Sequence, residues 1–224
     1  MKVKDMEIKK KTQGIIQLNE DVALGTMKML LSVFERRNVF YTLSGGTLLG
    51  AVRSNSFIPW DTGDIDINIC YEDVDTVSKI INDLIKEGYK VTAHKPSRQL
   101  EMEKEGFPHI DFVLFRIPKL LLILSNLFLF LPKFMRMGVI RFSQETYFKS
   151  EFLRPTDSYK RDQKLIRCRI VQLMKILFFN GNKKRSIVFY DFKVTIPYKS
   201  EELLELYYGR DWKVPKKKFV SYVA

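Results

Sequence analysis

Residues 64–69 read Asp-Ile-Asp-Ile-Asn-Ile, and this alternation of polar and aliphatic residues constrains the fold more than any other stretch. A strand sends alternate side chains to opposite faces, so the pattern predicts a strand whose isoleucines enter a core. Asp64 and Asp66 then project from the same face, roughly 6.5–7 Å apart along the strand. Neighbouring carboxylates repel each other unless a cation lies between them. Because hard divalent cations take such oxygen ligands and leave positions for phosphate, we expect Mg²⁺ (or Mn²⁺) here.

A glycine pair upstream supplies the second half of such a site. The apolar run 39–43 is a strand candidate, and Gly45, Gly46 and Thr47 follow it directly. Two glycines after a strand let the backbone approach a ligand and expose N–H groups at the start of the next helix, expected over 48–53. A Gly-Gly turn or a solvated Asp-x-Asp face is ordinary on its own, but the two in this order favour a nucleotide-handling site.

Two further side chains in this stretch have more than one interpretation. Arg53 ends the expected helix, where it could bind a phosphate bidentately or form a surface ion pair. Trp60 could present its ring face to a base or a choline group. Packing that positions the loop before the acids is the favoured alternative for Trp60.

Three segments, GGTLLGAVR (45–53), FIPWD (57–61) and DIDI (64–67), occur in an order that closely resembles the motifs of the LicD family. That family includes phosphocholine transferases and fukutin-related proteins. The family usually reads PWDDDIDI, whereas this chain reads PWDTGDIDI, which is one residue longer and lacks an acid between Asp61 and Asp64. Ser54 also stands where the family often has His. The pair Asp64 and Asp66 is retained, so the departure leaves mainly the role of Asp61 open.

A later segment supplies a third acid. Residues 109–115 form a strand by residue type, and Asp111 is an isolated acid among apolar neighbours, where burial without a cation or donors is costly. LicD relatives carry a similar segment, so the resemblance implies that Asp111 completes the metal site. His109 lies two residues away on the same face, and we expect it to hydrogen-bond Asp111 rather than act as a base. The expected catalytic and metal-binding residues are Asp64, Asp66 and Asp111, and the expected phosphate- or substrate-binding residues are Gly45, Gly46, Thr47, Arg53, Trp60 and Asp61.

The resemblance implies an α+β fold class: a nucleotidyltransferase-like core of a mixed β-sheet flanked by helices, with a more helical insertion in the second half. A chain of 224 residues with 46% hydrophobic residues is long enough for one such domain over 1–224. We expect core motifs at 38–115, a helical insertion at 119–184, and a C-terminal module at 186–217 whose YYGRDW also resembles the family. Periodicity and turn residues predict helices over 15–34, 72–88 and 165–179, and a further helix through Tyr208 that Ser200 caps and Gly209 ends. Strands are expected over 89–92 and 98–102, with Lys95 in the loop between them, and a hairpin over 186–196.

The net charge of +12 is compatible with nucleic acid, an anionic membrane or phosphate-bearing substrates as partners. The run Leu120–Leu131 is strongly apolar but shorter than the about 20 residues of a spanning helix. It is a core helix or an interfacial segment, and its apolar circumference slightly favours membrane contact. Cys70 and Cys168 have no metal-ligand spacing, and the basic N-terminus lacks a secretory signal. We therefore expect a cytoplasmic protein with peripheral contact to the inner face of the cell membrane.

The resemblance implies transfer of a phospho-alcohol, with phosphocholine the first choice and ribitol phosphate the choice of the fukutin-related branch. The donor would be a CDP-alcohol such as CDP-choline. The acceptor would be a sugar of a cell-surface glycan (lipopolysaccharide, teichoic acid or capsule) or of a lipid-linked glycan. One alternative is a nucleotidyltransferase acting on RNA or protein, but no RNA-binding module is visible, so nucleic acid is not an expected partner. The other is a non-catalytic, membrane-associated assembly protein, which the altered WDTGD loop favours.

Overall fold

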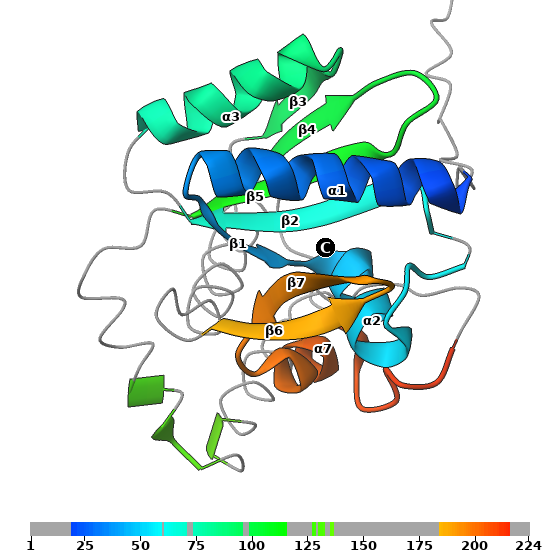
Figure 1. Cartoon of the computed structure of the whole chain (residues 1–224). Coiled ribbons are helices and arrows are strands. Elements are labelled where there is room, and N and C mark those ends of the chain that lie inside the picture. The colour runs from blue at the N-terminus through cyan, green and yellow to red at the C-terminus, as the bar shows by residue number, and fades with distance from the viewer. Residues whose placement is uncertain are drawn as a thin grey trace, which may run out of the picture.

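The computed structural model describes residues 19–59, 61–70, 74–95, 99–115, 127–128, 130–132, 135–136 and 184–215. Its helices and strands, labelled in Figure 1, form an α+β fold, which confirms the expected class. In chain order they are α1 (Glu20–Arg36), β1 (Phe40–Leu43), α2 (Gly45–Ser54), β2 (Asp64–Cys70), α3 (Val74–Lys86), β3 (Lys90–Lys95), β4 (Gln99–Glu103), β5 (His109–Phe115), β6 (Lys184–Phe189), β7 (Phe192–Pro197) and α7 (Ser200–Tyr208).

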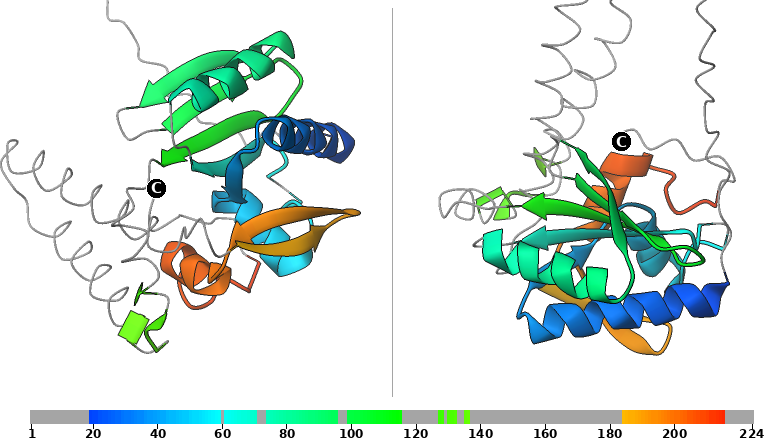
Figure 2. Two further views of the ribbon diagram at one scale, coloured as in Figure 1. Left: turned by 60° about the vertical axis from the view of Figure 1, so that its left-hand side comes forward. Right: turned by 90° about the horizontal axis from the view of Figure 1, so that it is seen from above.

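The main sheet has five strands in the order β1-β2-β5-β4-β3. Strands β2 and β5 are parallel, whereas β1–β2, β5–β4 and β4–β3 are antiparallel, so the sheet is mixed as expected. Helices α1 and α3 lie side by side over one face of this sheet (Figures 1 and 2). The two acid-bearing strands, β2 and β5, are thus direct neighbours near the centre of the sheet.

The hydrophobic core follows from the alternation along these strands. Ile65, Ile67 and Ile69 of β2 are buried, as are Ile110 and Phe112 of β5. Because the side-chain period of a strand is two, burying one set of residues directs Asp64, Asp66 and Asp111 to the opposite face. The core therefore fixes which way the acids point.

A second, two-stranded sheet is formed by β6 and β7 and packs next to β1, with α7 beside α2 (Figure 1). The Tyr41 hydroxyl of β1 accepts a hydrogen bond from the Thr195 backbone N–H of β7 at 3.3 Å. This contact ties the C-terminal hairpin to the edge of the main sheet. The hairpin expected over 186–196 is confirmed.

Three helix starts differ from the expected ones. Helix α1 begins at Glu20 rather than at residue 15, with Asn19 as its N-cap. Helix α2 begins at Gly45 rather than at residue 48, because Ser44 takes an extended conformation as N-cap and both glycines enter the first turn. Ser200 is the first residue of α7 instead of its cap: Lys199 holds the N-cap position, without a side-chain capping hydrogen bond. The helix stops at Gly209 as expected. Lys95, expected in a loop, is the last residue of β3.

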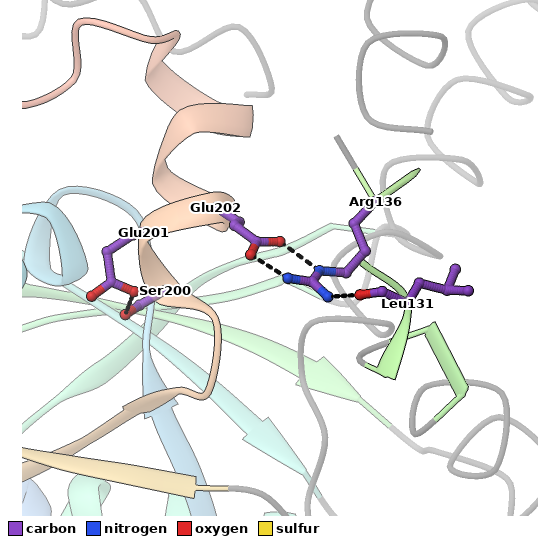
Figure 3. A network of polar contacts seen from close by, with 5 residues as sticks. All are labelled: Leu131, Arg136, Ser200, Glu201 and Glu202. Carbon is purple, nitrogen blue, oxygen red and sulfur yellow. Dashed lines mark hydrogen bonds and ion pairs between the residues drawn. The ribbon is translucent and has the colours of Figure 1, made fainter. Parts of the chain in front are cut away.

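Most of the expected insertion 119–184, including the helix predicted over 165–179, lies outside the described residues. Within its described part, Arg136 forms a buried ion pair with Glu202 of α7 (Figure 3). A search of the described residues for a helix long and apolar enough to cross a membrane found none.

Candidate functional site

Three acids from three neighbouring strands form a row across the main sheet. Asp66 of β2 is the direct partner of Asp111 on the parallel strand β5, and Asp111 is the direct partner of Glu101 on the antiparallel strand β4. Paired residues on adjacent strands project from the same face, and their strands lie about 4.8 Å apart. The sequence analysis expected Asp111 to join Asp64 and Asp66, and the structure makes Asp111 the register partner of Asp66. Glu101 is an additional acid that the sequence analysis did not identify.

Asp64 extends the row along β2, two residues before Asp66. Its register partner on β5 is His109, which lies two residues before Asp111 on that strand. Burial raises the pKa of Asp64, the charge of His109 lowers it, and the charge of Glu101 raises it. His109 thus partly offsets the repulsion that Asp64 experiences from other acids.

The turn between β1 and α2 holds Asp66 in place. The Gly46 backbone N–H donates to Oδ2 of Asp66 at 2.8 Å, and the Asp66 backbone N–H donates to the Thr47 hydroxyl oxygen at 2.9 Å. The Ser44 backbone N–H donates to the Asp66 carbonyl at 3.0 Å. Gly46 and Thr47, together with Gly45, were predicted to bind phosphate. In this structure, Gly46 and Thr47 bind β2 itself, and a role toward phosphate stays a prediction.

The two glycines are required by the closeness of the acids. A β-carbon on Gly45, which has a φ of +48°, would lie 2.3 Å from Oδ2 of Asp66. A β-carbon on Gly46 would lie 2.6 Å from Oδ2 of Asp61. Both distances are shorter than any real contact, so carboxylates from two segments fill the space that side chains at 45 and 46 would occupy. Asp61 therefore belongs to the same cluster, despite the altered loop that carries it.

Electrostatic repulsion within this cluster is strongest at Asp66. The pKa of Asp66 is raised to about 7, first by burial and then by the charges of Asp64, Asp111 and Asp61, while the hydrogen bond from the Gly46 N–H lowers it. The pKa of Asp61 is also raised, first by burial and then by the charge of Asp64. Asp66 thus interacts electrostatically with three other carboxylates.

Arg53, on the same helix as the glycine turn, is the cationic side chain of this region. Its Nη1 atom is buried and has no hydrogen-bond partner within the described part of the chain. Burial lowers the pKa of Arg53, and its neighbour Tyr208 at the end of α7 opposes that effect. A buried guanidinium N–H without an acceptor is costly, so an anion at this position would be favourable. This observation agrees with the predicted phosphate contact of Arg53.

The C-terminal helix contributes a side chain that sequence reasoning missed. Burial raises the pKa of Tyr208, the charges of Asp66 and Asp61 raise it further, and Arg53 lowers it. Tyr208 therefore lies close to both the acids and the guanidinium. Its position in the YYGRDW pattern was noted as a family-like feature, but its proximity to the acids depends on how α7 packs against α2.

The hairpin tip between β6 and β7 fixes the loop that leads to Asp61. The Tyr190 backbone N–H donates to the Asn55 carbonyl at 2.8 Å, and the Tyr190 hydroxyl accepts from the Phe57 N–H at 3.0 Å. The same hydroxyl donates to the carboxylate of Glu20 at the start of α1. Three elements therefore meet at one tyrosine, which the sequence analysis had read only as part of a hairpin.

The residues present suit a divalent cation by their chemistry. The donors are carboxylate oxygens, which hard cations prefer, and a cation beside Asp66 would offset the burial and the neighbouring charges that raise the pKa of this group. As the side chains lie, no group of three His, Cys, Asp or Glu residues among those described is arranged to hold a metal ion. The metal-binding roles of Asp64, Asp66 and Asp111 therefore stay predictions. Trp60 lies outside the described residues.

Comparison with known proteins identifies a family for this architecture. The family model described as LicD/FKTN/FKRP, nucleotidyltransferase domain, matches residues 38–168. An uncharacterised protein of Rickettsia typhi is 32% identical over 107 residues, which cover 42% of this chain and 34% of that protein. The matched region contains all of the clustered acids, because β2, β4 and β5 lie within residues 38–168.

Two relatives with named activities match over shorter stretches. The lipopolysaccharide cholinephosphotransferase LicD of Haemophilus influenzae is 46% identical over 46 residues, covering 20% of this chain and 17% of that protein. The human ribitol 5-phosphate transferase FKRP is 47% identical over 49 residues, which cover 22% of this chain and 10% of that protein. The chain thus spans about a third or less of the length of each of these relatives. Among solved structures, the lincosamide antibiotic adenylyltransferase LnuA matches with a TM-score of 0.37 and 23% identity, over 46% of this chain and 60% of that one.

Proposed function

Because the chain belongs to the LicD/FKTN/FKRP family of nucleotidyltransferase domains, we propose that it is a metal-dependent transferase of phospho-alcohol groups. The donor is a CDP-alcohol, with CDP-choline the first choice and CDP-ribitol the second. The acceptor is a sugar hydroxyl of a cell-surface or lipid-linked glycan. The observation that carries the proposal is the direct pairing of Asp66 with Asp111 on parallel strands, beside the glycine turn of α2.

The reaction is a displacement at phosphorus. A hydroxyl oxygen of the acceptor forms a bond to the phosphorus that carries the alcohol, the bond from that phosphorus to the bridging oxygen breaks, and CMP leaves. The hydroxyl proton passes to a carboxylate of the cluster, which acts as general base. Phosphoryl transfer depends chiefly on positioning and on neutralising charge, and little covalent chemistry is required of the protein.

Different side chains have different proposed roles in this reaction. Asp64, Asp66 and Asp111 would hold Mg²⁺ or Mn²⁺, which when bound neutralises the diphosphate and the leaving nucleotide. Arg53 would bind a phosphate oxygen through its unpartnered Nη1. The turn at Gly45 and Gly46 keeps Asp66 next to the helix start, where backbone N–H groups favour an anion.

The test is release of CMP from CDP-choline or CDP-ribitol by the purified protein, with Mg²⁺ or with a chelator. Release is expected with Mg²⁺ only. Loss of a residue that hydrogen-bonds a metal ligand lowers activity roughly 10–100-fold. Because Asp66 and Asp111 are proposed as ligands themselves, Asp66→Asn and Asp111→Asn should each lower the rate of CMP release by more than this. Asp75→Asn, an exposed acid in the first turn of α3, is the matched control and should keep the activity.

The outcomes separate the proposal from its rivals. Incorporation of nucleotide into RNA or protein, without CMP release from CDP-alcohols, would identify a nucleotidyltransferase instead. A folded protein that binds neither Mg²⁺ nor CDP-alcohols would support the non-catalytic assembly protein. Full activity of Asp66→Asn would show that the cation is held elsewhere.

A further inference from the structure

Three large apolar side chains in the segment 127–136 are exposed to solvent. Leu127 is 60% exposed, Phe130 75% and Met135 46%. We call these three residues the apolar patch. Leu127 and Phe130 are three positions apart in a helical turn, so they share one side of it. Single exposed apolar residues are ordinary, but several large ones within ten residues indicate an interaction surface.

The other side of the same segment is anchored to the protein. Phe128 is buried, and so is the guanidinium of Arg136. Arg136 donates from Nε to Oε2 of Glu202 at 2.7 Å and from Nη2 to Oε1 at 2.5 Å, and its Nη1 donates to the Leu131 carbonyl (Figure 3). Among the described residues of 127–136, Phe128 and Arg136 are therefore docked, whereas the three residues of the apolar patch are exposed.

The anchor connects the apolar patch to the candidate site. Glu202 lies in the first turn of α7, and the last residue of that helix is Tyr208, which lies close to Asp66, Asp61 and Arg53. A buried ion pair with two parallel hydrogen bonds fixes orientation, whatever its net contribution to stability. The apolar patch is thus held in a defined position relative to the carboxylate cluster through α7.

The charge of the chain indicates what covers the apolar patch. The net charge is +12, and in the sequence Lys119, Lys133 and Arg141 flank the apolar run 120–131. Apolar side chains among basic ones are typical of a segment that enters the interface of an anionic bilayer. A second copy of the chain would instead bring two bodies of charge +12 together, which repel each other.

We propose that the apolar patch of Leu127, Phe130 and Met135 binds the surface of an anionic membrane. The ion pair between Arg136 and Glu202 holds the carboxylate cluster at a fixed place relative to that membrane. This surface suits an acceptor that is carried on a lipid. Membrane binding itself does not depend on the proposed transferase activity.

The test is co-sedimentation of the full chain with vesicles of phosphatidylcholine containing phosphatidylglycerol, and with vesicles of phosphatidylcholine alone. The wild-type protein is expected to bind the anionic vesicles and to be released by high salt. Phe130→Ser should weaken binding about tenfold, since a large apolar side chain would no longer enter the bilayer. Val188→Ser is the matched control, because Val188 on β6 is 53% exposed but lies outside the apolar patch; it should bind like the wild type.

Circular dichroism and size-exclusion chromatography with light scattering accompany the binding assay. Native spectra for both variants would exclude unfolding as the cause of lost binding. Equal binding of Phe130→Ser and wild type, or no binding of the wild type to anionic vesicles, would overturn the proposal. A wild-type dimer that Phe130→Ser converts to a monomer would overturn it in favour of a second copy of the chain. CMP release without vesicles, measured in parallel, reports on the transferase separately.

Discussion

Gly45 and Asp66 fit together so closely that a β-carbon on Gly45 would lie 2.3 Å from Oδ2 of the aspartate. The glycine also has a φ of +48°, a backbone conformation that other residues rarely adopt. Asp66 in turn accepts the N–H of Gly46 and donates its own N–H to Thr47. The start of α2 and the middle of β2 therefore form one structural unit, and neither can change without moving the other.

Gly45→Ala is expected to lower the free energy of unfolding by about 2–4 kcal/mol. Two costs add: the backbone strain of alanine at a positive φ, and the clash of its β-carbon with Asp66. Gly25→Ala is the control: no atom lies within 4 Å of a β-carbon there, and Gly25 is inside α1. That substitution should stabilise the protein by up to about 1 kcal/mol through helix propensity. Urea denaturation of both variants measures the difference. Equal stabilities would mean that Asp66 moves aside without cost.

Stability in a chelator should fall as the pH rises. The pKa of Asp66 is raised to about 7 in the folded protein, whereas an aspartate in an unfolded chain has a pKa of about 3.9. Between these values the folded state binds more protons than the unfolded state, so the free energy of unfolding decreases with increasing pH. From pH 4 to pH 8 the loss attributable to Asp66 is at most about 4 kcal/mol.

Asp66→Asn removes the titrating group and should flatten most of this pH dependence. A smaller slope of the same sign will persist, because the pKa values of Asp61 and Asp64 are also raised. Asp75→Asn should retain the full slope. Urea denaturation at several pH values measures the free energy of unfolding of the wild type and both variants. A wild-type stability that rises between pH 4 and 7 would show that repulsion within the acid cluster is relieved in some other way.

Tyr190→Phe tests the contact that holds the loop before Asp61. The substitution keeps the ring, which packs against Phe57 and Phe189, and removes both hydroxyl hydrogen bonds. Because the Phe57 N–H loses its partner in a partly buried position, the free energy of unfolding should fall by about 1–3 kcal/mol. Hydrogen exchange of the Phe57 amide should accelerate more than that of amides in β2.

The control for Tyr190→Phe lies at the same hairpin tip. Asp191 forms an exposed ion pair with Lys28 at 3.0 Å, and such pairs contribute little. Asp191→Asn should therefore leave the stability nearly unchanged and leave the exchange of the Phe57 amide unchanged. If both variants behaved alike, the hydroxyl of Tyr190 would have no special role in holding the loop.

The alternation along β2 and β5 was enough to predict which side chains share a face. It predicted the burial of Ile65, Ile67 and Ile69 because a period of two leaves no other choice once one face is packed. The order of the strands was not predictable in this way, since pairing joins segments far apart in the chain. Glu101 illustrates the limit. Only the register of β4 against β5 places it opposite Asp111, and from its sequence it reads as part of a solvated strand.

Tyr208 was missed for a related reason. Its place in α7 follows from an apolar helix pattern and a terminal glycine, both visible in the sequence. Its proximity to Asp66 and Arg53 depends on the docking of the hairpin against β1 and of α7 against α2. Those contacts join residues more than a hundred positions apart. Local patterns give elements and faces, whereas sites assembled from distant elements require the tertiary structure.

The ion pair between Arg136 and Glu202 gives the last prediction, because both side chains are buried. Arg136→Met should lower the free energy of unfolding by about 3–5 kcal/mol, since Glu202 would keep a buried charge without its partner. The double variant Arg136→Met, Glu202→Leu removes both charges and should recover most of this loss.

An exposed pair between β6 and the same helix provides the control for that comparison. Arg185 and Glu201 lie 2.8 Å apart, with about half of each side chain in water. Arg185→Met should cost no more than about 1 kcal/mol, because water replaces the lost partner of Glu201. Urea denaturation of the three variants and the wild type measures all of these differences. If the double variant were as unstable as Arg136→Met, the loss would come from disrupted packing around Phe128 and Leu131 and not from an unpaired charge.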